Sequence, residues 1–243
     1  MKRFWHLIEK IFGVYRWHPK IALRYLPVVK QLKARKIAED VLEIGSGGLG
    51  IAPYLKARVV GVDTEFKPPI FEKLIPVIAY AQNLPFPDKS FQAVISLDML
   101  EHIKADDRPK VIAEMVRVAR NFVCIGAPMG HAAHKQDELL RQDYKKKYGT
   151  DFPYLKEQVE HGVPEEAEVI SQIKQAAAEN RKISIKVLGN INLKFRYFMM
   201  TGWMTKSSIV NFIFRKLFLL PIPLFLKLNQ SPTYRKIIFV DFT

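Results

Sequence analysis

The segment 41–50 constrains the fold of this chain more than any other. It reads Val-Leu-Glu-Ile-Gly-Ser-Gly-Gly-Leu-Gly, an apolar run that ends in glycines and leads into a helix expected over 51–56. Glycines let the backbone turn sharply and approach a ligand closely. The N–H groups of the following helix then face a polar or anionic group. The segment therefore predicts a ligand-binding loop at the carboxyl end of a strand in an open α/β sheet.

Apolar runs recur along the rest of the chain with helical segments between them. Strands are expected over 40–45, 58–63, 77–81, 91–97 and 121–127, with two late strands over 183–188 and 235–242. A helix is expected to follow the capping residues 105–109 and to end near residue 119, and 131–180 is expected to be helical with breaks at Pro153 and Pro164. Strands separated by helices indicate a parallel sheet covered on both faces.

The same pattern predicts four parts of the chain. Residues 1–37 form an N-terminal helical segment, in which Phe4, Ile8 and Tyr15 recur at helical spacing. Residues 38–190 form the core, 191–234 a basic and apolar insertion, and 235–243 the final strand of the sheet.

The charge of the chain is concentrated at its two ends. The formal net charge is +14, and acidic residues are scarce after residue 180. A basic surface suits an anionic partner such as lipid headgroups, nucleic acid or a phosphorylated substrate, although solubility alone also explains it. A single cysteine excludes an internal disulfide and suits a reducing compartment. No secretory leader is expected, and the apolar run 217–226 is too short to span a bilayer, so we expect a cytoplasmic protein.

Two residues help to separate the ligands that such a glycine loop could bind. Gly45-x-Gly47-x-x-Gly50 also fits the dinucleotide fingerprint, which is a weak pattern by itself. Glu43 precedes the loop, where a carboxylate suits a ligand with a positive amino group better than a pyrophosphate. Asp63, at the end of the second strand, suits a ribose diol in either case. A tight turn without a ligand is the remaining alternative.

Several ordered motifs resemble class I S-adenosylmethionine (SAM)-dependent methyltransferases. Segment 42–47 resembles their first motif, and 61–63 resembles the end of their second strand. Residues 83–91, followed by Leu100-Glu101-His102-Ile103, are similar to the region around their fourth strand, in the branch that includes ubiquinone and menaquinone biosynthesis enzymes. With the strand pattern, this resemblance predicts an α/β Rossmann-like, doubly wound sheet of about seven strands. Five are parallel, and of the late pair the last strand is antiparallel.

The resemblance also implies roles for individual residues around SAM. Gly45, Ser46 and Gly47 would carry the backbone against the cofactor, and Glu43 would lie near its methionine amino group. Asp63 would bind the ribose hydroxyls with Thr64 beside it. The remaining implied positions are Gln82 and Asn83 by the adenine, and Ser96 and Leu97 at the methionine end. Tyr80 stands where an acid is usual, which puts the usual adenine contact in doubt and leaves Gln82 as its replacement.

A catalytic residue is difficult to identify from the sequence, because a sulfonium donor needs alignment more than proton transfer. His102 is a candidate general base for an oxygen acceptor, although a packing role explains it as well. His131 and His134 are expected at the surface, with no third ligand for a metal. Cys124 is expected to be a buried apolar residue.

The basic and apolar region 194–228 suggests where the acceptor binds. It combines many aromatic and aliphatic residues with lysines and arginines, which suits either a buried cap or the surface of an anionic membrane. RNA is a less favoured partner. The leading hypothesis is a methyltransferase acting on a small or lipid-linked acceptor, for instance in quinone or cell-envelope metabolism. The alternatives are an RNA methyltransferase and a non-catalytic scaffold of the same fold at a membrane.

Overall fold

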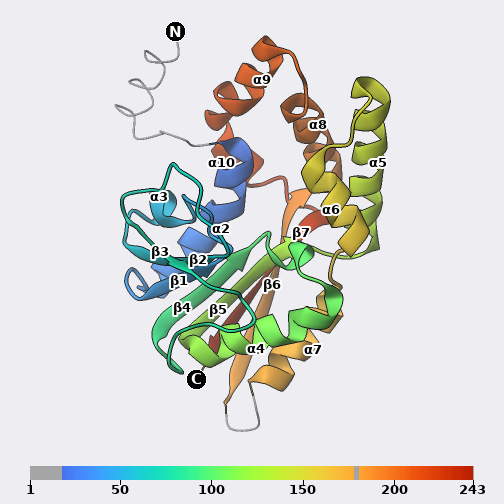
Figure 1. The fold of residues 1–243 in the computed structure, drawn as a ribbon. Coiled ribbons are helices and arrows are strands. Elements are labelled where there is room, and N and C mark those ends of the chain that lie inside the picture. The colour runs from blue at the N-terminus through green and yellow to red at the C-terminus, as the bar shows by residue number, and fades with distance from the viewer. Residues whose placement is uncertain (1–17, 178–180, 243) are drawn as a thin grey trace.

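Seven strands form one mixed sheet in the order β3-β2-β1-β4-β5-β7-β6 (Figure 1). The computed structural model describes residues 18–177 and 181–242. The strands are β1 (Val41–Ile44), β2 (Val59–Asp63), β3 (Leu74–Ile78), β4 (Phe91–Leu97), β5 (Ala119–Pro128), β6 (Ile183–Asn192) and β7 (Thr233–Phe242). The first five are parallel, and β7 runs antiparallel to both β5 and β6. The predicted fold class is therefore confirmed.

The strand order reverses beside β1. The chain moves outward from β1 to β2 and β3 and then returns to the other side of β1 with β4. At such a switch point the connections leave neighbouring strands in opposite directions, and a crevice opens beyond their carboxyl ends. The candidate site lies at this crevice.

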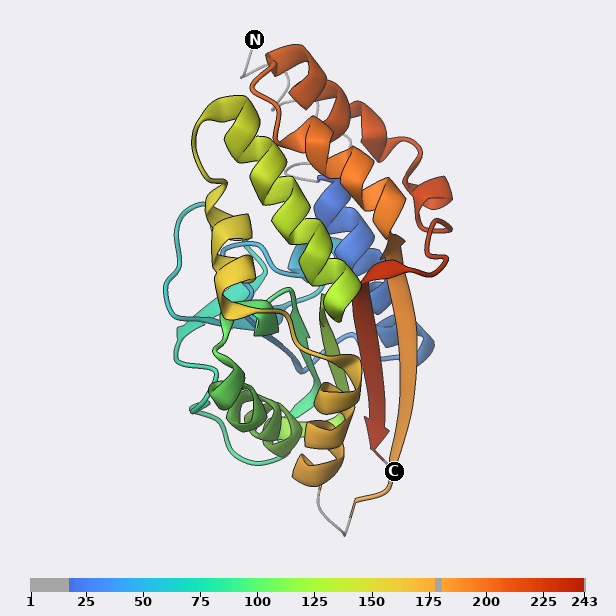
Figure 2. The same cartoon turned by 90° about the vertical axis from the view of Figure 1, so that its right-hand side faces the viewer.

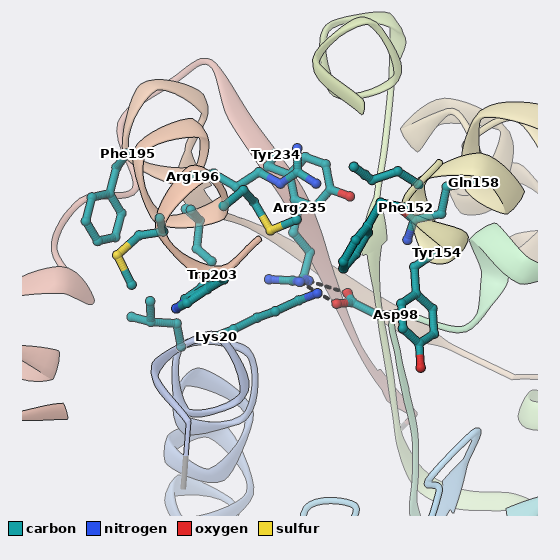
Figure 3. A pocket seen from close by; sticks show the side chains of 15 residues that line it. Lys20, Asp98, Phe152, Tyr154, Gln158, Phe195, Arg196, Trp203, Tyr234 and Arg235 are labelled. Carbon is teal, nitrogen blue, oxygen red and sulfur yellow. Dashed lines mark hydrogen bonds and ion pairs between the residues drawn. The ribbon is translucent and has the colours of Figure 1, made fainter. Parts of the chain in front are cut away.

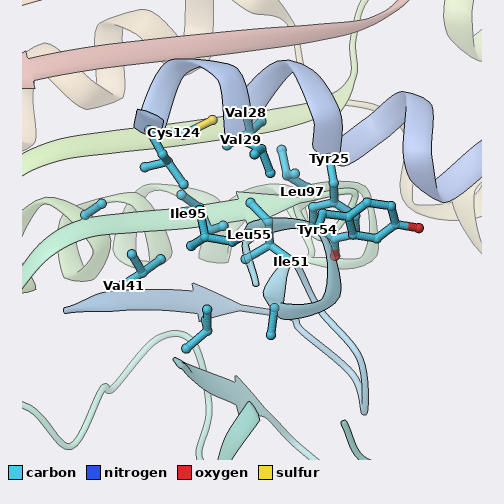
Figure 4. Close-up of a cluster of buried hydrophobic side chains, with 14 of the residues drawn as sticks. Tyr25, Val28, Val29, Val41, Ile51, Tyr54, Leu55, Ile95, Leu97 and Cys124 are labelled. Carbon is cyan, nitrogen blue, oxygen red and sulfur yellow. The ribbon is translucent and has the colours of Figure 1, made fainter. Parts of the chain in front are cut away.

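Two cores lie on opposite faces of the sheet. Helix α2 (Pro19–Ala34) and the short α3 (Ala52–Leu55) cover one face, as Figure 4 shows for part of this core. Helices α4 (Arg108–Val118) and α7 (Glu166–Ala176) cover the other. Because side chains of a strand alternate between faces, Ile95 packs in the first core and Val94 in the second. Cys124 is fully buried in the first core, as expected.

A layer of helices lies beyond the carboxyl ends of the strands (Figure 2). It contains α5 (His131–Tyr148), α6 (Pro153–His161), α8 (Leu193–Trp203), α9 (Ser208–Arg215) and α10 (Ile222–Phe225), with the 3-10 turn η3 (Leu217–Leu219) before α10. Two further 3-10 turns, η1 (Leu100–His102) and η2 (Ala105–Asp107), precede α4. In the part of the chain that the structure describes, no helix combines the length and apolarity needed to cross a bilayer.

Some expected boundaries differ from those of the structure. The third strand begins and ends three residues earlier than predicted, because its register with β2 pairs Val59 with Leu74 and Asp63 with Ile78. Pairing of Asn192 with Thr233 extends both late strands, so the insertion between them runs from 193 to 232. The helix after the glycines has only four residues. The predicted helical positions 4–15 lie outside the described residues.

Candidate functional site

The glycine loop follows β1 and turns immediately toward β2. The Gly45 N–H donates to the Val62 carbonyl over 2.8 Å. Gly45 has φ +74°, and a Cβ there would lie 2.6 Å from Cγ of Met99. Gly47 is also left-handed, at φ +55°, but a Cβ there would meet no atom within 4 Å. Gly45 is therefore required by packing and by backbone conformation, whereas Gly47 borders open space.

Glu43 is fully buried beneath this loop. One carboxylate oxygen accepts a hydrogen bond from the Tyr25 hydroxyl over 2.7 Å, and the other accepts from the Ile51 N–H over 2.6 Å. Burial raises the pKa of Glu43 to about 7, although both hydrogen bonds oppose this shift. Both oxygens are therefore engaged within the protein, and Glu43 fixes the loop in place. Its expected contact with an amino group stays a prediction.

Asp63 links the end of β2 to the same loop. Its carboxylate accepts from the Gly47 N–H over 2.9 Å and from the Thr64 N–H over 2.8 Å. Asp63 remains half-buried, and each carboxylate oxygen keeps a free lone pair for a ligand hydroxyl. This geometry suits the ribose role that the sequence predicts.

An open cleft of about 380 Å³ lies beside these residues, a volume within the range of small-molecule sites. Its walls include Gly45, Asp63, Thr64, Gln82 and His102 among the predicted residues, together with Ile44, Val62, Ala79, Tyr80, Ala81, Met99, Ile103 and Glu157. The structure therefore gathers five predicted residues from the carboxyl ends of four strands, β1 to β4, around one cleft. Tyr80, which is 71% exposed, adds an aromatic face to it.

The other predicted residues lie outside the cleft wall. Ser46 is buried beneath the loop and Asn83 is exposed. Ser96 and Leu97 are each 1% exposed because they still belong to the hydrogen-bonded part of β4. The chain leaves the sheet at Asp98, and Met99 is the first residue after β4 that lines the cleft. The structure thus assigns the cleft wall at this strand end to Met99 and not to Ser96 or Leu97.

His102 lies at the rim of the cleft in η1. Its Nδ1 is 3.2 Å from a carboxylate oxygen of Glu157, which comes from α6. The side chain is 28% exposed, so the Glu157 contact orients it while leaving it open to a ligand. His131 is exposed, and Nε2 of His134 lies 3.4 Å from Glu138. Neither residue lines the cleft.

A second, smaller and more enclosed cavity of about 40 Å³ lies between α2, α6, α8 and the start of β7 (Figure 3). Its apolar and aromatic lining is Leu23, Phe152, Tyr154, Leu155, Ile191, Phe195, Met199, Met200, Trp203 and Tyr234. Its polar lining is Lys20, Asp98, Gln158, Arg196 and Arg235. The sequence interpretation placed none of these polar residues in a site. The one local signal was an acid, Asp98, directly after β4.

Asp98 is the centre of a buried network in this cavity. The Arg235 guanidinium donates hydrogen bonds to both carboxylate oxygens of Asp98, and a guanidinium nitrogen of Arg24 lies 2.9 Å from one of them. These arginines hold the pKa of Asp98 well below its usual range despite burial. Arg235 also donates to Asn190 over 2.7 Å. The network ties α2 to β4, β6 and β7.

The comparisons with known proteins agree with this geometry. Residues 42–122 match the family model described as a methyltransferase domain. No curated protein gives a significant match. Among solved structures, magnesium protoporphyrin IX methyltransferase of Synechocystis PCC 6803, with bound S-adenosylhomocysteine (SAH), is 14% identical with a TM-score of 0.50. The alignment covers 89% of this chain and 81% of that one.

A second similar structure is described as a methyltransferase from an antibiotic biosynthesis pathway of Anabaena variabilis. It is 16% identical with a TM-score of 0.50, over 89% of this chain and 98% of that one. These likenesses show the fold. Residues 42–122 thus match a methyltransferase-domain model within a Rossmann-like fold, and the Synechocystis enzyme of the same fold holds SAH.

Proposed function

We propose that this protein transfers the methyl group of SAM to a small or lipid-linked acceptor bound in the enclosed cavity. One observation carries the proposal. Two adjacent residues at the end of β4 line different cavities, Met99 the open cleft and Asp98 the enclosed cavity. Helix α6 borders both, through Glu157 on one side and Gln158 on the other. The methyl donor in the open cleft and the acceptor in the enclosed cavity would therefore lie on either side of Asp98 and Met99.

The residues of the open cleft fit the proposed cofactor. The loop around Gly45 and Gly47 leaves room for close backbone approach, and Asp63 offers acceptor lone pairs for the ribose hydroxyls. Gln82 lies where an adenine edge could be read. SAM supplies an activated methyl group, so the protein's part is to align the acceptor and exclude water. Glu43 and Tyr25 contribute by holding the loop.

The enclosed cavity favours a small or lipid-linked acceptor over RNA. Its aromatic and aliphatic walls suit a ring or a chain rather than a folded nucleic acid, and its volume of about 40 Å³ requires side chains to move before either can enter. Quinone precursors, suggested by the likeness of segment 83–103 to the ubiquinone and menaquinone branch, have such a ring. A non-catalytic scaffold would not need an enclosed cavity next to the cofactor cleft.

Turnover of radiolabelled SAM tests the proposal directly. The purified protein is incubated with a lipid extract, a small-molecule extract and total RNA, and label transfer is counted. Gly45→Ala serves as the matched inactive variant. Transfer to the lipid or small-molecule fraction is expected. Transfer to RNA would favour an RNA methyltransferase, and SAM binding without transfer to any fraction would favour the scaffold.

We further propose that the insertion rests on an anionic membrane, on the inner face in a cytoplasmic protein. Its exposed apolar side chains are Phe198, Ile209, Val210, Leu217, Leu220 and Leu224, of which Leu220 is 81% exposed. The exposed cations Lys206, Arg215 and Lys227 accompany them. Apolar side chains with interspersed cations suit shallow insertion among anionic lipids. A lipid-linked acceptor would then pass along α8, which belongs to the insertion and also lines the enclosed cavity.

A further inference from the structure

More cations than carboxylates gather in and beside the enclosed cavity; Arg196 and Arg235 are buried, and Lys20 and Arg24 are half-buried. Arg24 and Arg235 share Asp98, and Arg196 pairs with Asp137 over 2.6 Å. Lys20 is a fourth cation, and its side chain extends toward the Asp98–Arg235 pair in Figure 3. The described residues thus place four cations against two charged carboxylates.

Two further acidic groups restore the balance only in part. Glu43, which interacts with Arg24, has a pKa raised to about 7 by burial. Glu101 is fully buried, and burial together with Asp98 raises its pKa to about 8. It is therefore largely uncharged at neutral pH. Its Oε2 has no hydrogen-bond partner, and its Oε1 accepts only a long, 3.5 Å bond from Gln158. The cluster consequently carries more positive than negative charge, which is costly inside a protein.

Lys20 is the cation without a partner. Within the described part of the chain, its ammonium group makes no hydrogen bond or ion pair, while its backbone N–H donates to the side chain of His18. Burial and nearby Arg24 lower its pKa to about 8, which leaves it mostly charged at neutral pH. Lys20 also occupies the first turn of α2, where the helix dipole is already positive. Burial, Arg24 and the helix dipole oppose a cation and favour an anion at this place, whereas Asp98 favours the charged form of Lys20 and raises its pKa.

We infer that the enclosed cavity binds an acceptor with an anionic group, a carboxylate or a phosphate, on an apolar ring or chain, and that Lys20 is the counterion of that group. The aromatic walls hold the apolar body, and the arginines stay with their own carboxylates. Because no hydrogen bond or ion pair holds the Lys20 ammonium group, its side chain can move, and the cavity of about 40 Å³ requires such a movement before a ring can enter. This inference rests on the proposed function, whose acceptor it narrows to an anion.

Calorimetry with three single-ring probes tests the inference. Benzoate and phenyl phosphate carry the anion, and benzyl alcohol has the same ring without charge. The wild type is expected to bind both anions at least about 10-fold more tightly than the alcohol. Lys20→Met should weaken the anions about 10- to 100-fold, the range of a charge-assisted contact, and leave the alcohol unchanged. Lys33→Met, at an exposed lysine of the same helix, should match the wild type.

Urea unfolding supplies a second readout. Removing an unpaired, half-buried cation should leave the unfolding midpoint of Lys20→Met equal to or above that of the wild type. Equal binding of the anions and the alcohol, an unchanged anion affinity in Lys20→Met, or a lowered midpoint would each overturn the inference. Dihexanoyl phosphatidic acid, added as a fourth probe, distinguishes a lipid source of the anion from a soluble one by its affinity relative to phenyl phosphate.

The proposed methyl transfer and the proposed anion site can be refuted independently. SAM affinity is measured on the wild type in the same calorimeter, without any acceptor probe. SAM binding without an anion preference would overturn this inference alone. An anion preference without SAM binding would overturn the proposed function and leave the anion site standing.

Discussion

Tyr25 and Glu43 are joined by a 2.7 Å hydrogen bond in which the phenol donates to a buried carboxylate. The bond connects the middle of α2 to the strand that leads into the glycine loop. The first turn of the same helix carries Lys20, which lines the enclosed cavity. Helix α2 therefore contacts both the proposed cofactor site and the proposed acceptor site, and it can keep the two in register.

Burial of Glu43 makes the stability of the fold depend on pH. The pKa of Glu43 is raised to about 7 from an ordinary value of 4.5, so the folded protein holds a proton that the unfolded chain releases. The stabilising contribution is complete below pH 4.5 and is lost as pH rises through about 7. We expect Glu43→Gln to flatten the fall in unfolding free energy between pH 5 and about 8, measured by urea denaturation.

Glu39→Gln, at an exposed position before β1, is the control and should keep the wild-type profile. Glu101, whose pKa is raised to about 8, contributes with the same sign, so some slope should persist in Glu43→Gln. An unaltered slope in that variant would contradict the role assigned to Glu43.

Gly45→Ala should disrupt the loop more than its backbone conformation alone explains. Gly45 and Gly149 have nearly equal φ values, +74° and +73°. A Cβ at Gly45 would collide with Met99, whereas a Cβ at Gly149 would meet nothing within 4 Å. Gly149→Ala therefore measures the conformational cost, about 1–2 kcal/mol. Gly45→Ala should cost more than this and weaken SAM binding at least about 10-fold by calorimetry. Equal effects of both variants would show that the close approach to Met99 is unimportant.

Asp63→Ala should weaken SAM binding by about 1.5–3 kcal/mol, because a charged hydrogen-bond acceptor is lost. The Gly47 N–H also loses its partner. Isothermal calorimetry measures the affinity, and Asp106→Ala, at an exposed acid in η2, should bind as the wild type does. Unchanged SAM affinity in Asp63→Ala would remove this residue from the cofactor site, and tight NAD binding instead of SAM would favour a dehydrogenase-like site.

His102→Gln should leave SAM binding intact and lower turnover only modestly. The imidazole lies at the cleft rim beside Glu157, but methyl transfer from a sulfonium depends mainly on alignment. Turnover is measured with the acceptor fraction found by radiolabelling, and exposed His161→Gln is the control. A loss at or beyond the general-base range of about 10²–10⁴-fold, with folding preserved, would identify His102 as an essential base.

The wild-type protein should sediment with anionic vesicles and less with neutral ones. Each cation near the surface adds about 1 kcal/mol, so high salt should release part of the bound protein. Leu220→Asp with Leu224→Asp should reduce binding, because these exposed side chains would insert among the lipids. Leu139→Asp, at a 48% exposed leucine of α5, should bind normally. Equal sedimentation of both variants, or none for the wild type, would leave the insertion as a cap only.

Local residue patterns were sufficient to predict the fold class and much of the open cleft. The glycine loop needs a backbone conformation that few residue types adopt, so Gly45 and Gly47 reveal it in any context. Asp63 ends a strand whose apolar pattern is visible in sequence. Strand limits were less predictable, since the register of β3 on β2 depends on pairing between segments and not on composition. For the same reason Met99, and not Ser96 or Leu97, reaches the cleft.

The sequence by itself determined the strands of the sheet, the glycine loop and the acid Asp63 beside it. Each of these depends on residues that are close together in the chain. Only the tertiary structure decided the enclosed cavity. Lys20 and Arg235 come from opposite ends of the chain, and they meet because β7 inserts between β5 and β6 while α2 packs across the sheet. No local pattern encodes that meeting. The excess of buried positive charge exists only after the long-range strand pairing has brought these side chains together.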